Sequence, residues 1–400
     1  MNSGILEKIT KHFDNVNYDI KKTGNARFFD QKCTPDILCA VSECITVFSE
    51  ENNSKKFSVK DIWSSSLANE IMTKQFQKPD VKNTKAQNEY DKIFSQPIKL
   101  LEYANVISAS GKRGNTNIYE IKNNEILEYV GQGDQKALKF LLQYIKKVLK
   151  DSEIYYLYEN FLEKQTKDSF NYLKDTYLKF IIDNTPINTD IEVRRIFPKI
   201  LNPLAYAENK IGSKDGRLSK TPISYTEIMY NRPNFRDELK PKNQPRREYV
   251  GSASEEVVKN YLVAKAKRKI KLHHKESEVH RYEYGDATQV HHIFPINEFP
   301  EFSDTYENLI LLTPQQHYEF AHPKNDTHKI SKSYQLVCLL SKLDSIEMSK
   351  FWADDFYDIH TFINMINKCL NHNLLMPNMT IPHVKNAIAK YYLDSSVSPD

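Results

Sequence analysis

The chain has 400 residues, of which 40% are hydrophobic, so it is long enough for two or three domains with buried cores. Lys and Arg exceed Asp and Glu by four (56 − 52), a net charge too small to indicate an acidic partner by itself. No run approaches the ~20 apolar residues of a membrane span, no signal-peptide core is visible, and the five cysteines form no CxxC pair. These features predict a soluble cytoplasmic protein without membrane contact or disulfide framework.

Apolar residues recur mostly at helical spacing and glycine is scarce, with 10 residues in the whole chain. We therefore expect a mainly helical protein with small β elements, an α+β class. Differences in composition along the chain suggest three regions, which are residues 1–130, 131–250 and 251–400.

The first region contains helix-like and strand-like segments in a characteristic order. The sequence predicts helices over 35–50 and 88–105, an extended step into a helix at 57–63, and strands at 106–110 and 117–122 around a basic turn. This order resembles a winged helix-turn-helix DNA-binding domain. The resemblance implies that Lys92 and Lys99 lie on the helix that enters the major groove, and that Lys112 and Arg113 form the tip of the wing. A small α+β domain that binds protein, or nothing, is the alternative.

The second region begins with three predicted helices, over 135–150, 153–164 and 168–182. Five aromatic side chains in them are expected in the core: Tyr144, Tyr156, Phe161, Phe170 and Tyr177. Residues 210–247 follow, with ten Lys or Arg, four Asp or Glu, and several prolines that exclude a long helix. We interpret this stretch as a basic connector that follows the DNA backbone, with Arg246 and Arg247 as phosphate contacts. A solvated loop is the alternative.

The third region begins with a helix expected from Ser252, which has capping-box spacing to Glu255, to about residue 272. A short strand is predicted at 290–294 and a second at 309–312. Thr313 is suited to cap a following helix that carries His317, with Pro314 at its first position. Strand, loop, strand and helix together form a ββα hairpin.

Histidines in this hairpin suggest hydrolysis of phosphodiester bonds. A neutral imidazole can take a proton from water, and a divalent cation can neutralise the phosphate and stabilise the leaving 3′ oxygen. Adjacent side chains on a strand point to opposite faces, so His291 and His292 cannot both face one metal. One of the two would bind the cation and the other would act on water.

The adjacent histidines, the asparagine that begins the next strand and the helix histidine resemble the HNH, or ββα-metal, nuclease family over about 35 residues. The resemblance implies that His291 and His317 are metal ligands, that His292 is the general base, and that Asn308 pins the loop and orients the base. Mg²⁺, or another divalent metal such as Mn²⁺, would be the cofactor.

His322 follows His317 by five residues. In an α-helix five residues turn through ~500°, so its side chain would point away from that of His317. A third metal ligand and a capping or phosphate contact both remain open for this residue. A second adjacent pair, His273 and His274, lies in a basic stretch and is expected to be solvated or to face phosphate.

The sequence also offers two other interpretations, a structural zinc site and a nuclease of another type. A histidine cluster could hold structural zinc, but closed zinc sites usually include thiolates, and no cysteine lies near these histidines. Residues 237–240 could supply the acidic-x-Lys half of a PD-(D/E)xK nuclease, but their proline-rich surroundings do not suit a central strand.

A nuclease site fused to a groove-reading module suggests cutting at chosen sites. We therefore expect a type II-like restriction endonuclease that cleaves double-stranded DNA as a homodimer or by two successive nicks. A homing or phage-type nicking nuclease is the alternative among enzymes. A DNA-binding regulator with structural zinc is the alternative among non-enzymes.

Overall fold

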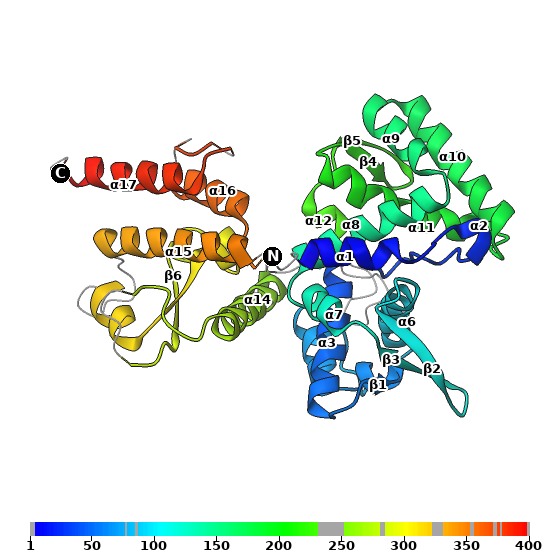
Figure 1. Cartoon of the computed structure of the whole chain (residues 1–400), viewed down its shortest axis with the longest axis horizontal. Helices are drawn as coiled ribbons and strands as arrows, with labels where there is room; N and C mark the ends of the chain where they lie inside the picture. Colours follow the sequence, from blue (N-terminus) through cyan, green and yellow to red (C-terminus); the bar gives the residue numbers. More distant parts are fainter. Residues whose placement is uncertain are drawn as a thin grey trace. The chain divides into compact units, whose positions relative to one another are not determined.

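The computed structural model describes residues 5–76, 78–84, 87–230, 252–280, 285–321, 331–352, 356–370, 374–376 and 378–397. The described residues are mainly helical with three small antiparallel sheets, which agrees with the predicted mainly helical α+β class. The chain divides into two compact units, residues 1–250 and 251–400 (Figure 1). None of the described helices is both long enough and apolar enough to cross a bilayer.

The first half of unit 1 contains short helices around a three-stranded sheet. Its elements are α1 (Ile5–Asp14), α2 (Ile20–Thr23), α3 (Pro35–Glu51), β1 (Lys56–Phe57), α4 (Val59–Trp63), α5 (Ser66–Lys74), α6 (Gln87–Tyr103), β2 (Ile107–Arg113), β3 (Thr116–Ile121) and α7 (Asn124–Gly131). The strand order is β1-β3-β2, and all pairs are antiparallel. A capping box between Ser58 and Asp61 fixes the step from β1 into α4, where an extended step was predicted.

The β2–β3 hairpin is longer than the sequence predicted. Lys112 pairs with Asn117 and Arg113 with Thr116, so the two basic residues lie in the last rungs of the ladder and not in the turn. The turn falls at Gly114, whose φ of 62° is a left-handed conformation that favours glycine. The two predicted strands are present. The turn between them, however, lies at Gly114, after Lys112 and Arg113, and not at these two basic residues.

The second half of unit 1 contains α8 (Asp134–Asp151), α9 (Tyr155–Lys164), α10 (Lys167–Asn184), α11 (Asp190–Ala207), β4 (Ile211–Lys214), β5 (Arg217–Pro222) and α12 (Tyr225–Ile228). The first three helices were predicted, and four of the five expected core aromatics are buried: Tyr144, Phe161, Phe170 and Tyr177. Tyr156 is 59% exposed, so its expected burial is wrong. It lies between Tyr155 and Leu157 on α9, but on the face turned away from the core.

Residues 210–228 do not form the irregular connector that their prolines suggested. They form the β4–β5 hairpin and α12, and Pro222 occupies the last position of β5. The pairing of Lys214 with Arg217 closes the hairpin. Its turn is held by Lys174 of α10, which donates a hydrogen bond to the Gly216 carbonyl. The predicted connector from residue 231 onwards, with Arg246, Arg247 and residues 237–240, lies outside the described residues.

Unit 2 packs helices around a two-stranded hairpin. It contains α14 (Ser252–His273), β6 (Gln289–His292), η1 (Pro300–Phe302), η2 (Tyr306–Asn308), β7 (Leu309–Leu312), η3 (Gln316–Ala321), α15 (Lys332–Trp352), α16 (Ile359–Cys369) and α17 (Ile381–Val397). β6 pairs with β7 in antiparallel register, α14 contacts both strands, and α15 contacts η3. The predicted strand, loop, strand and helix are all present.

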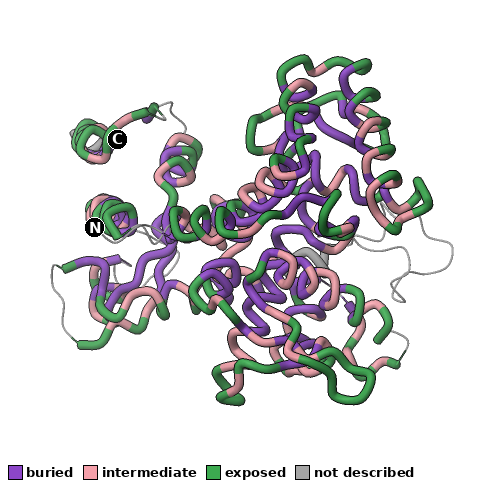
Figure 2. Tube along the Cα trace, turned by 45° about the vertical axis from the view of Figure 1, so that its right-hand side comes forward, coloured by how far each residue is buried: buried purple, intermediate pink, exposed green. Residues whose placement is uncertain are grey.

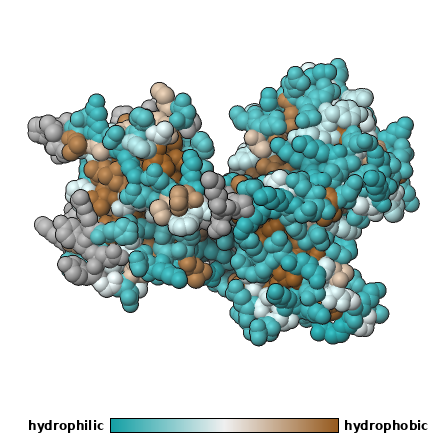
Figure 3. Space-filling model, viewed as in Figure 1, coloured by the Kyte–Doolittle hydropathy of each residue, from teal (hydrophilic) through white to brown (hydrophobic). Residues whose placement is uncertain are grey.

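Both units bury apolar interiors (Figure 2). In unit 2 all four residues of β7 are buried in a cluster with side chains of α14, α15 and α16. On the face drawn in Figure 3 the described surface of each unit is mostly hydrophilic, with smaller apolar areas. The β6–β7 hairpin is thus anchored in a hydrophobic core, which gives the histidines at its end a fixed backbone.

Candidate active site

The β6–β7 register places the two adjacent histidines in different surroundings. His291 pairs with Ile310 and His292 with Leu309, so their side chains lie on opposite faces of the hairpin. The His291 ring lies edge-on to the ring of His317, with centroids 5.3 Å apart and planes at 76°. His291 is 4% exposed and His317 is half-buried. A strand and the following helix therefore bring together the two histidines predicted to bind a metal.

The start of the helix that carries His317 is fixed by Thr313 and Gln316. Thr313 Oγ1 accepts a hydrogen bond from the Gln316 amide, and Gln316 Oε1 accepts one from the Thr313 amide, which is the reciprocal arrangement of a capping box. Gln316 also donates to the Val279 carbonyl and accepts from the Ser277 hydroxyl, both at 2.6 Å. Thr313 thus caps the helix as predicted, and the role of Gln316 was missed.

The helix itself is a π-helix over Gln316–Ala321. A π-helix closes hydrogen bonds between residues five apart, and such segments often occur at functional sites. The expectation that His322 points away from His317 assumed α-helical geometry, and that assumption is wrong for this segment. His322 itself lies outside the described residues.

His292 is held by the loop between the two strands. Its Nε2 lies 2.9 Å from the Ser303 carbonyl oxygen, and a carbonyl only accepts, so Nε2 carries a hydrogen. In the neutral ring Nδ1 is then the nitrogen able to accept a proton. Burial lowers the pKa of His292 to about 4, although the bond to Ser303 opposes this shift, and the nearby charge of Lys267 adds to it. The imidazole is therefore neutral at pH 7.

Asn308 anchors that same loop to the beginning of β7. The side chain is fully buried; its Oδ1 accepts from the Phe294 amide at 2.8 Å, and its Nδ2 donates to the carbonyls of Phe294 and Phe302 at 3.0 and 3.1 Å. These three bonds join the end of β6 to the segment just before Ser303. Asn308 thereby supports His292 through the loop.

A buried polar network on the other side of β7 was not predicted. The Glu278 amide donates to the Leu311 carbonyl at 3.0 Å, and Glu278 Oε1 accepts from the Leu311 amide at 2.9 Å. Its second oxygen pairs with Lys342 and accepts from the Ser345 hydroxyl at 2.7 Å. Burial opposes the charge of Glu278, but Lys342 and His274 together hold the pKa of this carboxyl below its usual value. The network holds β7 in place through the backbone of Leu311.

His274 belongs to this network, and both His273 and His274 are half-buried, so the pair is more enclosed than the solvated pair that was expected. The His273 ring stacks on Phe356 with centroids 3.7 Å apart. His274 Nε2 lies 2.6 Å from the Tyr357 hydroxyl and 3.4 Å from Glu278 Oε2. Both rings are used in packing and hydrogen bonding at the end of α14.

The residues predicted to contact DNA from unit 1 lie on α6 and β2. Lys92 and Lys112 are exposed. Lys99 Nζ lies 2.6 Å from Glu102 Oε2, and Arg113 Nη2 lies 3.3 Å from Asp61 Oδ2. These two cations have carboxylate partners within the chain, and their side chains are 42% and 69% exposed. Contact with a phosphate by either would compete with an internal ion pair.

Among the described residues no group of three or more His, Cys, Asp or Glu side chains is placed to hold a metal ion. The pair of His291 and His317 offers two imidazole nitrogens. A further ligand would be water, a phosphate oxygen or a residue outside the described ones, such as His322. Imidazole suits Zn²⁺, Ni²⁺ or Co²⁺, whereas Mg²⁺ and Mn²⁺ prefer oxygen ligands, and Mn²⁺ accepts imidazole more readily than Mg²⁺ does. The donor set fits an open site for a transition-metal ion better than one for Mg²⁺.

Comparisons of the chain with known protein families, with curated proteins and with solved structures found no match.

Proposed function

We propose that the chain is a metal-dependent endonuclease of the HNH type that hydrolyses double-stranded DNA at specific sites, in the manner of a type II restriction endonuclease. The observation that carries this proposal is the pairing of the His291 and His317 rings beside a neutral His292 whose tautomer is fixed by Ser303. A base and a potential cation site lie on neighbouring residues of one strand end, which is the minimum that phosphodiester hydrolysis requires.

His292 is proposed to take the proton from the attacking water. Its Nδ1 accepts the proton, and the imidazolium that forms is stabilised at Nε2 by the Ser303 carbonyl, which already accepts a hydrogen bond there. Asn308 keeps this carbonyl in place by holding the loop on both sides. The half-buried ammonium of Lys267, close enough to affect the pKa of His292, is suited to meet the negative charge of the phosphate.

His291 and His317 are proposed to hold the divalent metal, with His322 as a further candidate. When bound, the cation would supply positive charge to the phosphate and to the leaving 3′ oxygen. The two rings are held by separate elements, β6 and η3, and each element is anchored by buried hydrogen bonds. This rigidity favours a fixed ligand geometry.

Recognition of DNA is proposed for unit 1. Its helices and β2–β3 hairpin follow the element order of a winged helix, with the exposed side chains of Lys92 on α6 and Lys112 on β2. We further propose a cytoplasmic protein that acts as a homodimer, because one hydrolytic site per chain would otherwise need two successive nicks to cut both strands.

Incubation of purified protein with supercoiled plasmid tests this proposal. Parallel reactions would contain Mn²⁺, Ni²⁺, Zn²⁺, Mg²⁺ or chelator, and the ends of any fragments would be sequenced. Discrete fragments that appear only with metal, and whose ends share one sequence, are the expected result. A smear would replace the restriction assignment with a nonspecific nuclease, and intact plasmid with every metal would refute the enzyme assignment.

A DNA-binding regulator with structural zinc is the second candidate. It is favoured by one observation, the half-buried position of His317 against the buried His291. Tight zinc retention with DNA binding and no cleavage would support it. Four protein ligands would then be needed, whereas the described residues supply two.

A further inference from the structure

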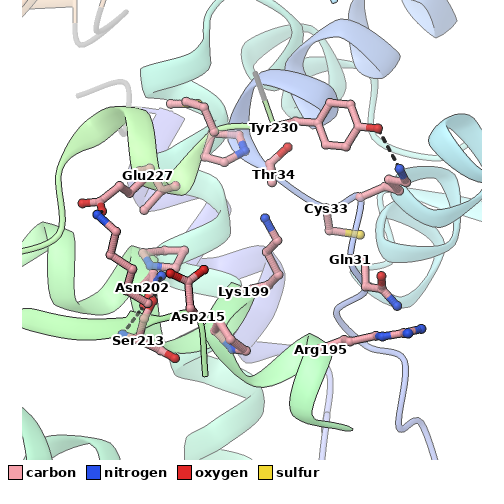
Figure 4. A pocket seen from close by; sticks show the side chains of 17 residues that line it. Gln31, Cys33, Thr34, Arg195, Lys199, Asn202, Ser213, Asp215, Glu227 and Tyr230 are labelled. Carbon is pink, nitrogen blue, oxygen red and sulfur yellow. Dashed lines mark hydrogen bonds and ion pairs between the residues drawn. The ribbon is translucent and has the colours of Figure 1, made fainter. Parts of the chain in front are cut away.

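A cavity of about 370 Å³ lies within unit 1, whereas the histidines discussed above belong to unit 2. It is bounded by the segment before α3, one side of α11, the β4–β5 turn and the residues after α12 (Figure 4). This volume is within the range of about 300–1,000 Å³ found for small-molecule sites. All of its walls belong to one compact unit, so the cavity is a property of that unit alone.

The lining of this cavity is positively charged. Its ionisable side chains, apart from the Cys33 thiol and the Tyr230 hydroxyl, are Lys32, Arg195, Lys199, Lys214, Asp215 and Glu227, which is two more cations than carboxylates (4 − 2). Glu227 is already engaged, since its Oε1 lies 2.9 Å from Lys214 Nζ and its Oε2 accepts from the Ser224 amide. Lys32 lies 2.5 Å from Glu89. The balance of charge favours an anionic occupant over a metal ion.

Two of the cations, Arg195 and Lys199, lie four residues apart on α11 and therefore on the same face of that helix. Figure 4 shows the Lys199 side chain extending into the middle of the cavity, between Thr34 and Asp215, while Arg195 extends along one edge. One cation is thus central and the other is placed at the rim.

The strand β4, which packs against α11, contributes a hydroxyl that has no hydrogen-bond partner among the described residues. Ser213 is 4% exposed, and its Oγ has no hydrogen-bond partner among the described residues. Its backbone is held firmly, because Asn202 donates to its carbonyl at 2.9 Å and accepts from its amide at 2.8 Å. A buried hydroxyl without a partner is unfavourable, and a rotation of this side chain towards the cavity would bring it to an acceptor atom of a bound ligand.

The N-terminus of α3 opens on the same cavity. Thr34 is the N-cap residue of this 17-residue helix, is 1% exposed, and makes no side-chain cap hydrogen bond. Thr34 and Pro35 both line the cavity. The start of a helix carries partial positive charge, but the buried carboxylate of Asp36 in this first turn already accepts from the Ile37 and Tyr230 amides, so the main attraction for an anion comes from the cations of α11.

We propose that this cavity binds the phosphate group of a nucleotide-sized ligand. Lys199 and Arg195 neutralise the phosphate, and the hydroxyl of Ser213 donates to one of its oxygens. A phosphate presents several acceptor oxygens, which matches a set of donors converging from α11 and β4. The phosphate could belong to a free nucleoside monophosphate or to a nucleotide of bound DNA, and both sources share the chemistry recognised here.

The test uses the full chain in the presence of chelator, so that no metal-dependent cleavage takes place. Isothermal titration with inorganic phosphate, with each of the four 5′-deoxynucleoside monophosphates, and with a 12-base-pair duplex is carried out on wild type and on Lys199→Gln, Arg195→Gln and Ser213→Ala. Arg194→Gln is the matched control, since Arg194 is exposed on the same helix, pairs with Asp190 and does not line the cavity.

We expect at least one nucleoside monophosphate to bind and Lys199→Gln to weaken its affinity about tenfold or more, because a charge-assisted hydrogen bond is lost. Arg195→Gln and Ser213→Ala should weaken it several-fold, and Arg194→Gln should leave it unchanged. An effect of Lys199→Gln on the duplex alone would assign the site to the DNA backbone. No binding of any phosphate compound, or equal binding by all variants, would overturn the proposal. Neither result depends on whether the chain cleaves DNA.

Discussion

Unit 2 contains two pairs of adjacent histidines, and their comparison shows how surroundings decide what such a pair can do. His273 and His274 end a helix, and their rings stack on Phe356 or bond to Tyr357 and Glu278. His291 and His292 end a strand, so one ring meets His317 and the other is fixed by a backbone carbonyl. The first pair is used in holding the fold. The second pair presents a proton acceptor, Nδ1 of His292, and a potential metal ligand, His291, which lies against a second potential ligand, His317.

The largest difference between the pairs is expected in catalysis. His292→Ala should lower the rate of plasmid cleavage by about 10²- to 10⁴-fold, the usual contribution of a general base, while leaving the affinity for DNA nearly unchanged. His274→Asn, the matched control from the other pair, should change the rate less than threefold. Single-turnover cleavage and gel-shift binding of both variants measure this contrast. Equal rates for the two would remove the proposed distinction between the pairs.

The stabilising role of the first pair depends on the buried ion pair between Glu278 and Lys342. Lys342→Met leaves Glu278 buried without its main partner, and such changes cost about 3–5 kcal/mol of the free energy of unfolding. Lys385→Met, which removes an exposed pair with Asp344, should cost less than about 1 kcal/mol. Urea denaturation followed by tryptophan fluorescence, with Trp352 on α15, compares them. Similar losses for both would show that the network is not a major support.

Asn308 is expected to stabilise the loop between β6 and β7, whose Ser303 carbonyl holds His292. Asn308→Ala removes three buried hydrogen bonds and leaves backbone groups of Phe294 and Phe302 unsatisfied, which should cost about 3 kcal/mol. Hydrogen exchange of the segment 293–303 should increase in the variant more than exchange of α16. Protection that stays as in wild type would contradict the anchoring role of Asn308.

A pH-dependent effect on stability is expected at Glu307, which precedes Asn308 in the chain. Burial raises the pKa of Glu307 to about 7, although a hydrogen bond from the Asp358 amide opposes the shift. The folded state therefore binds this proton more tightly than the unfolded state. The associated stability is present in full below pH 4.5 and is lost as pH rises to about 7, on the order of 3 kcal/mol in total.

Glu307→Gln does not titrate, so its stability relative to wild type should increase between pH 4.5 and 8. Urea denaturation at several pH values measures this difference, with Glu301→Gln as the control because Glu301 is exposed on η1. A difference that does not change with pH would show that Glu307 is charged in the folded protein throughout this range.

Much of the hairpin could be predicted because its signals are local. The β-strand pattern, Pro295, the Thr313 cap and the alternation of His291 and His292 all act over a few residues. Contacts that join distant segments were not predictable: Glu278 bonds to Leu311 across 33 residues and to Lys342 across 64. The π form of η3 was also missed, since α-helical and π-helical turns share the same residue preferences at this length.

Two proline-containing segments were not predicted correctly, since no helix was predicted over α11 and residues 210–222 were expected to be a connector. Pro198 and Pro203 both lie inside α11, whose apolar positions from Val193 to Leu204 pack into the core and outweigh the lost hydrogen bonds. Pro222 ends a strand of a hairpin in a stretch expected to be a connector. In both places packing against distant parts of the chain determines the structure. Such packing cannot be inferred from the few residues around each proline.

The most direct test of the account is a titration of Mn²⁺ into the purified chain, followed by electron paramagnetic resonance. We predict one bound ion per chain, with affinity lowered at least about tenfold in both His291→Ala and His317→Ala and retained in His292→Ala and His274→Asn. Absence of binding in wild type, or binding that neither ligand variant weakens, would contradict the claim that β6 and η3 together hold a cation.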